Sequence, residues 1–291
     1  HRLTATRGDT TALSAVSGGL GLTGICTAAE VRIRPVSTGW MLVDSHRCET
    51  ADELFDQLGR ASSDAYSFAR IDVAGTGLGI SRGTVVTGRH AKVLDLPEVR
   101  QSDALTYVPS TVDRNTTTLP LRLAGIFGSR TKQSLTHRTA PSLRRDELMP
   151  LAAFFHSAAE DRLASKRANA TLTYEFTVPL ASVELIPRFL ERLALIGGDG
   201  DNATVQRRTV ASASPLGISV DGWSFSIELT SDTPGLGRML DEWDERVAAN
   251  HGQVAVSTDS RMRPEAVAAM YPALSEWHKL RDELDPGRHF C

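Results

Sequence analysis

The chain has 291 residues, 41% of them hydrophobic, and a formal net charge of -3. Typical domains have roughly 100 to 200 residues, so we expect two domains or one divided domain. The scattered charge argues against nucleic acid as a partner, and no apolar run reaches the roughly 18 residues that span a bilayer. Cys26, Cys48 and Cys291 lack metal-ligand spacing, so we expect a reducing compartment, no disulfide framework and no metal site.

Four glycines lie within Ser17–Gly24, directly before Ile25–Val36. Glycine is favoured where the backbone must approach a ligand or take a positive φ. The segment therefore predicts either a backbone-lined cofactor edge or a flexible loop. Apolar residues alternate with arginines at 31–35, which predicts a half-buried strand.

Helix and strand then alternate along the first half. A strand is expected at 40–43 and a helix at 50–58, where Thr50 and Glu53 have the spacing of a capping pair. Between 75 and 145, glycines, prolines and polar runs leave only 82–87 and 119–127 as ordered segments. That stretch reads as loops that cover a pocket, or as connecting chain.

The second half has the clearer periodicity. Strands are expected at 172–178, 203–210 and 223–230, and helices at 182–196 and 236–250, each ended by a glycine-containing pair. Strict alternation in 223–230 sends its apolar residues to the core and Ser224 and Ser226 to the opposite face. This order predicts an α+β fold, with an antiparallel or mixed sheet that carries helices on one face.

The tail contains further short motifs: Ser257-Thr258-Asp259-Ser260-Arg261, Ala269-Met270-Tyr271-Pro272, Glu276-Trp277, Leu280-Arg281 and Leu284-Asp285-Pro286. With the glycine segment, this ordered set resembles the FAD-linked oxidases of the vanillyl-alcohol-oxidase type, most of all the branch that oxidises a polyprenylphosphoryl ribose. The resemblance implies FAD as cofactor and a flavin domain split around a substrate domain. Residues 1–37 would end the first part of the FAD-binding domain, 38–254 would form the substrate domain, and 255–291 would return to the FAD-binding domain.

The chain starts at His1 and stops in what reads as a continuing segment, so we expect a fragment of a longer protein. In the family, a phosphate-cradling loop and, in many members, a histidine linked covalently to the flavin lie upstream of the position that matches His1. The backbone donors that would bind the pyrophosphate are therefore expected to be largely missing. The fragment alone is expected to be inactive.

The resemblance also implies site residues. Those expected against the flavin are Ser17, Gly18, Gly19, Gly21, Thr23, Gly24, Ile25 and Ala255. Those expected against the substrate are Glu175, Arg207, Ser224, Ser226 and Thr258. The alignment at Arg207 leaves Gln206 and Arg208 open, and a guanidinium there would suit a phosphate-bearing substrate. Exposed strand serines and a solvated arginine are the competing interpretations.

Three positions depart from the family pattern. Thr258 replaces a lysine that interacts with the sugar, Ala255 replaces a tyrosine that touches the cofactor, and Ser226 replaces a cysteine near the flavin. No base can be named, so the catalytic residues are left unknown. Asp259, Ser260 and Arg261 read as structural, with Arg261 paired to a carboxylate, and His156 reads as a core or surface residue.

The function implied is that of an FAD-dependent oxidoreductase acting on a secondary alcohol of a sugar or polyprenylphosphoryl sugar, in cell wall biosynthesis, by hydride transfer to flavin. The alternatives are an aldonolactone oxidase and a non-catalytic fragment or decayed paralogue that keeps only the substrate-binding fold. A reductase partner that completes an epimerisation is implied. The expected location is cytoplasmic or peripheral to the membrane.

Overall fold

The structure of the chain is a computed structural model, which describes residues 10–61, 65–73, 82–108, 142–156, 171–198, 200–209, 214–258 and 261–290. The expected segment at 119–127 lies outside these residues, as do Asp259 and Ser260. For His156 the structure describes the backbone only.

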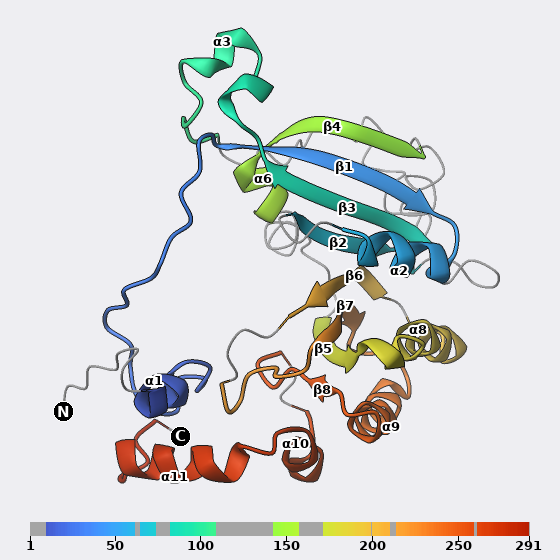
Figure 1. Cartoon of the computed structure of the whole chain (residues 1–291). Helices are drawn as coiled ribbons and strands as arrows, with labels where there is room; N and C mark the ends of the chain where they lie inside the picture. The colour runs from blue at the N-terminus through green and yellow to red at the C-terminus, as the bar shows by residue number, and fades with distance from the viewer. Residues whose placement is uncertain are drawn as a thin grey trace.

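One sheet organises the described residues (Figure 1). Its eight strands lie in the order β4-β1-β3-β2-β6-β7-β5-β8, and each described pairing is antiparallel. The strands are β1 (Trp40–Cys48), β2 (Tyr66–Ile71), β3 (Gly83–His90), β4 (Leu143–Pro150), β5 (Thr171–Pro179), β6 (Gly200–Arg208), β7 (Gly222–Thr230) and β8 (Gln253–Val254). The predicted antiparallel sheet is confirmed, together with the predicted strands that fall within described residues after position 39. The sequence pattern does not predict β2 or β4.

The helices are α1 (Thr10–Val16), α2 (Ala51–Gly59), α3 (Glu98–Gln101), α6 (Leu151–His156), α8 (Leu185–Leu195), α9 (Leu236–Ala249), α10 (Pro264–Met270) and α11 (Leu274–Leu284), with short 3₁₀ turns η1 (Val93–Asp95) and η2 (Leu180–Ser182). The start of α2 follows the predicted cap, because the Thr50 hydroxyl accepts a hydrogen bond from the Glu53 N–H. Gly197, with a φ of 68°, follows the end of α8 as expected.

Helices α2, α8 and α9 cover one face of the sheet, which we call the helix-covered face. Strand alternation sends Phe176 and Phe225 to this side, where they contact the ring of Phe189 from α8. Trp243 from α9 packs on the same ring, with centroids 5.3 Å apart. These fully or almost fully buried aromatic residues form the centre of the main core.

The other side of β5 and β7 carries Glu175, Thr177, Ser224 and Ser226, and we call it the polar face. Towards β1, β2 and β3 this same side of the sheet becomes apolar, and short helix α6 packs there through Phe154. The sheet thus places its polar face beside an apolar patch on one surface.

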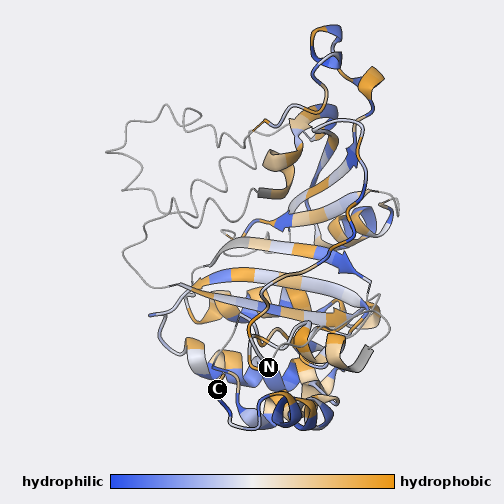
Figure 2. Cartoon of the chain, turned by 90° about the vertical axis from the view of Figure 1, so that its left-hand side faces the viewer, coloured by the Kyte–Doolittle hydropathy of each residue, from blue (hydrophilic) through white to orange (hydrophobic). Residues whose placement is uncertain are grey.

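The segment between α1 and β1 is extended but is not a strand. Val31 and Ile33 are 73% and 81% exposed, and 24–36 pairs with no strand in the described parts of the chain. The prediction of a half-buried strand at 31–35 is therefore wrong, because alternation makes a strand only where a partner edge supplies hydrogen bonds. Figures 1 and 2 show this segment running past the sheet on the side opposite to α2, α8 and α9.

The two ends of the described chain lie side by side. Helix α1, which leads into the glycine segment, contacts α11, which leads into Asp285 (Figure 1). Asp285 is buried and accepts a hydrogen bond from the Phe290 N–H at 3.0 Å. The boundaries predicted at 37/38 and 254/255 stay predictions.

Candidate functional site

The register of β5 and β7 places the polar residues of the two strands opposite one another. Glu175 lies opposite Ser226, and Thr177 lies opposite Ser224. The Ser224 hydroxyl donates to Glu175 Oε1 at 3.4 Å. The buried Thr177 Oγ1 has no hydrogen-bond partner among the described residues. This face therefore holds hydrogen-bonding capacity that the described residues leave unused.

The turn after β8 brings two more predicted residues beside Glu175. The Ala255 N–H donates to the Glu175 carbonyl at 2.9 Å, which anchors the turn to β5. Within the turn, the Thr258 hydroxyl donates to the Ala255 carbonyl at 3.1 Å. Thr258 thus lies near the polar face, but its hydroxyl supports the turn and brings no positive charge.

Tyr271 is buried beside β8. Its hydroxyl donates to the Val254 carbonyl at 2.6 Å, and the side chain is 1% exposed. Burial raises the pKa of Tyr271 to about 12; the backbone of Val256 opposes this shift, the charge of Glu175 adds to it and the charge of Arg208 opposes it. The phenol therefore stays neutral at ordinary pH and lies within electrostatic reach of Glu175 and Arg208.

The structure separates Arg207 from the other residues expected against the substrate. Arg207 pairs in register with Trp223, and its guanidinium carbon lies 5.9 Å from that ring's centroid on the helix-covered face. Arg208 is the next residue and alternates to the side of Glu175. Of the three positions that the alignment leaves open, Arg208 is the cation on the polar face.

The glycine segment folds into turns at the end of α1. Gly18, Gly21 and Gly24 have positive φ values of 81°, 78° and 146°. A side chain at Gly19 would collide with the Ala15 carbonyl, so this glycine is required for close packing. Thr23 is almost buried, whereas Ile25 is 78% exposed.

The loop before β7, at 214–219, makes one hydrogen bond to the glycine segment and another to β8. The Ser214 hydroxyl donates to the Ser17 carbonyl. Further along the same loop, the Ser219 N–H donates to Gln253 Oε1 at 2.6 Å. Gln253 is the first residue of β8, the strand that ends directly before Ala255. The loop at 214–219 thus contacts the start of the glycine segment at one end and β8 at the other.

Two of the glycines expected against the flavin have an open backbone. A Cβ placed at Gly21 or Gly24 would meet nothing within 4 Å. Ala255, 5% exposed and lacking a bulky side chain, lies at the turn beside Glu175. The assignment of these residues to the flavin stays a prediction.

Arg261 is confirmed as a structural residue. Its guanidinium pairs with Asp241 and, at 2.9 Å, with Asp244. Asp244 is 2% exposed and also accepts a hydrogen bond from the Tyr174 hydroxyl at 2.7 Å. This network holds the chain at Arg261 against α9.

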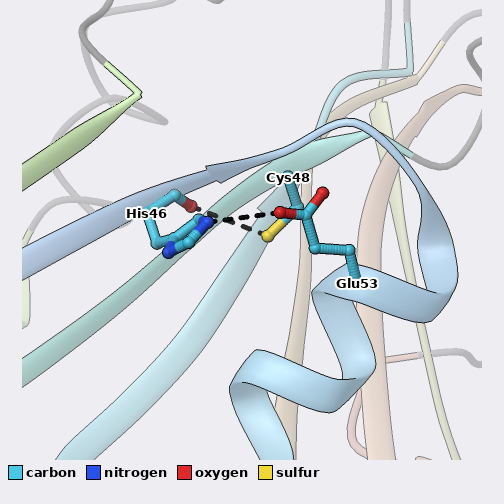
Figure 3. Close-up of side chains that lie close together, drawn as sticks. All are labelled: His46, Cys48 and Glu53. Carbon is cyan, nitrogen blue, oxygen red and sulfur yellow. Dashed lines mark hydrogen bonds and ion pairs between the residues drawn. The ribbon is translucent and has the colours of Figure 1, made fainter.

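A second cluster on the helix-covered side escapes the sequence analysis (Figure 3). It consists of His46, Cys48 and Glu53, whose ligand-type atoms all lie within 4.8 Å of one another. Burial raises the pKa of the Cys48 thiol to about 11, and the charge of Glu53 adds to the shift. The signal that could find the cluster is a His-x-Cys pair at the end of a strand, followed by a glutamate in the first turn of a helix.

No helix in the described parts of the chain is long and apolar enough to cross a membrane.

The comparisons with known proteins give relatives over nearly the whole chain. An uncharacterised protein encoded in the mprA 5' region of Streptomyces coelicolor is 33% identical over 289 residues, which cover 95% of this chain and 77% of that protein. Decaprenylphosphoryl-beta-D-ribose oxidase of Mycolicibacterium smegmatis is 27% identical over 296 residues, covering 100% of this chain and 64% of the oxidase. No family model matches the chain.

Among solved structures, 6-hydroxy-D-nicotine oxidase from Arthrobacter nicotinovorans is similar with a TM-score of 0.50 and 14% identity. The match covers 96% of this chain and 59% of that oxidase, and at this identity it supports the fold alone. The chain therefore spans less than two thirds of the length of both oxidases.

Proposed function

Because the chain belongs to the FAD-linked oxidases of the vanillyl-alcohol-oxidase type, we propose that it is part of an FAD-dependent oxidoreductase that oxidises a secondary alcohol of a sugar or lipid-linked sugar. The observation that carries the proposal is the polar face, where Ser224 donates to Glu175 and the Ala255 turn is anchored to the backbone of Glu175. A ligand held on this face would meet these polar side chains beside the Ala255 turn.

In this proposal each of these residues has a role toward the flavin or toward the substrate. The backbone at Gly21 and Gly24 and the small side chain of Ala255 would border the flavin ring. Oxidation removes a proton from the hydroxyl and a hydride from its carbon, and FAD supplies the hydride acceptor when bound. Glu175 would accept a hydrogen bond from a sugar hydroxyl, with Ser224 holding its carboxylate in place.

Arg208 could bind an anionic group on the substrate. Arg208 lies on the side of Glu175, and its guanidinium can form two hydrogen bonds to one phosphate. Thr258 and Ala255 replace the family lysine and tyrosine, so substrate contacts here differ from those of the ribose oxidase. A sugar phosphate linked to a lipid satisfies both the polar face and Arg208, and a reductase partner that returns the ketone to the epimeric alcohol belongs to the same proposal.

The proposal is tested with the full-length flavoprotein under anaerobic conditions. Addition of the substrate alcohol should bleach the flavin absorbance, and Glu175→Gln should weaken the apparent affinity for that alcohol by roughly ten- to hundredfold, because a charged hydrogen bond is lost. Glu191→Gln, on the exposed side of α8, is the matched control and should behave like the wild type.

Two results would contradict the proposal. One is a protein that binds FAD but is reduced by no sugar, polyol or lactone offered. The other is a response to the alcohol that Glu175→Gln and Glu191→Gln change equally. The absence of a positive charge at Thr258 favours one competing candidate, a substrate-binding fold without catalysis, and the first result would support it.

A further inference from the structure

The cluster of His46, Cys48 and Glu53 lies on the side of the sheet opposite to Glu175. His46 and Cys48 are two residues apart in β1, so alternation directs both side chains to the helix-covered side. The chain then turns at Glu49 and Thr50 into α2, whose third residue is Glu53. Strand, turn and helix thus bring three different donor atoms to one point (Figure 3).

The distances between the three donor atoms are close to those of a zinc site. His46 Nε2 and Glu53 Oε1 are 3.2 Å apart. Two ligand atoms at zinc distances in a tetrahedral site lie about 3.3 to 3.5 Å apart, so this pair needs almost no movement. With all three donor atoms within 4.8 Å of one another, the Cys48 sulfur requires only a small shift to complete a three-ligand site.

A backbone hydrogen bond orients the carboxylate of Glu53. Glu53 Oε2 accepts a hydrogen bond from the Glu49 N–H at 2.9 Å, which leaves Oε1 directed to His46. The Glu53 N–H in turn donates to Thr50 Oγ1 at 3.2 Å. Such supporting hydrogen bonds fix a ligand's orientation at metal sites.

Access and chemistry agree with an ion that has one open position. The His46 and Glu53 side chains are 36% and 38% exposed, while Cys48 is buried beneath them. His46 also lines a cavity of about 410 Å³ between α2, β1, β3 and β4. A fourth ligand such as water could therefore approach from the cavity or from solvent. A set of sulfur, imidazole nitrogen and one carboxylate oxygen is typical of zinc and unsuitable for magnesium or calcium.

We propose that His46, Cys48 and Glu53 bind one Zn²⁺ and leave its fourth position open. The ion would fasten the start of α2 to the end of β1. The site is independent of the proposed oxidation, because none of its ligands belongs to the polar face.

The test uses the full-length protein, freed of metal by a chelator and kept reduced. Titration with Zn²⁺ against a chromophoric chelator should show one tight site per chain. Cys48→Ser, His46→Gln and Glu53→Gln should each weaken binding at least tenfold, because loss of even an outer-shell partner costs about 10- to 100-fold. Glu53→Gln is the most informative variant, since glutamine also serves at this helix position and leaves the cap intact.

Matched controls separate this site from adventitious binding. Cys26→Ser removes an exposed thiol outside the cluster, and His278→Gln removes an exposed histidine outside it; both should retain the wild-type affinity. Cobalt in place of zinc should give a thiolate charge-transfer absorption that Cys48→Ser loses and Cys26→Ser keeps. Mg²⁺ should not compete.

The proposal is overturned if the metal-free wild type takes up no stoichiometric Zn²⁺. It is also overturned if folded Glu53→Gln and His46→Gln, checked by circular dichroism, bind Zn²⁺ as tightly as the two controls. Either outcome would leave the His46 and Glu53 contact as a hydrogen bond between β1 and α2.

Discussion

In β5 and β7, alternate residues of the same two strands form the helix-covered face and the polar face. On one side Tyr174 and Phe176 are fully buried, and the ring of Phe189 packs on both of them. On the other side Glu175 makes a long hydrogen bond of 3.4 Å to Ser224, and Thr177 Oγ1 has no partner among the described residues. Stability is concentrated on the first side, whereas the second retains polar groups that a ligand could use.

The difference teaches how to separate structural residues from functional ones in this chain. A residue whose contacts are satisfied within the described fold should matter mainly for the free energy of unfolding. A residue with long or missing hydrogen bonds should matter little for unfolding and more for binding. The following substitutions test that division, from the largest expected effect on stability to the smallest.

Phe189→Ala should have the largest effect. The Phe189 ring contacts four aromatic rings and is fully buried, so its removal should lower the free energy of unfolding by about 3 to 5 kcal/mol. Phe68→Ala is the matched control, because Phe68 is only partly buried against Phe154 on the other side of the sheet. It should cost about 1 to 2 kcal/mol. Equal losses in urea denaturation would show that the helix-covered face has no special role in stability.

Much of this division can be predicted from the sequence. The period of two at 223–230 and the capping pair at Thr50 and Glu53 are local signals, and both are confirmed. The extended segment at 31–35 shows why the rest could not be predicted. Its alternation is as regular as that of β7, but a strand also needs a neighbouring edge, and no local pattern reports one. β2 and β4 escape prediction for the complementary reason, since distant strands complete their hydrogen bonding.

The candidate site shows the same limit. The resemblance assigns Glu175 and Ser224 to the substrate and Ala255 to the flavin, and the structure places these three residues beside one another. At Arg207 a slip of one residue reverses the face, so the cation on the polar face is Arg208. The cluster at His46 and Cys48 depends on a turn that returns Glu53 to the strand. Because that turn is a matter of three-dimensional geometry, cysteine spacing alone gives no sign of it.

Arg261→Met should have the second largest effect. The substitution keeps the aliphatic stem but removes the cation that pairs with the buried carboxylate of Asp244, to which the Tyr174 hydroxyl still donates a hydrogen bond. Breaking a buried pair costs about 3 to 5 kcal/mol, and the partial exposure of Arg261 reduces the expected loss to about 2 kcal/mol. Arg60→Met, which breaks an exposed pair with Asp56, should cost less than about 0.5 kcal/mol. Indistinguishable urea midpoints for the two variants would mean that the tail is not held by this network.

Ser224→Ala should have the smallest effect on stability and so tests the polar face most directly. Within the described parts of the chain, its hydroxyl makes only the long bond to Glu175, so the free energy of unfolding should change by less than about 1 kcal/mol. If Ser224 positions the carboxylate for a sugar hydroxyl, the KM for the alcohol in the full-length flavoprotein should rise roughly two- to tenfold with little change in kcat. A loss of stability as large as that of Arg261→Met, with KM unchanged, would reverse the assignment. The polar face would then be a structural surface whose hydrogen bonds are stronger than their lengths indicate, and the separation of the two faces by role would fail.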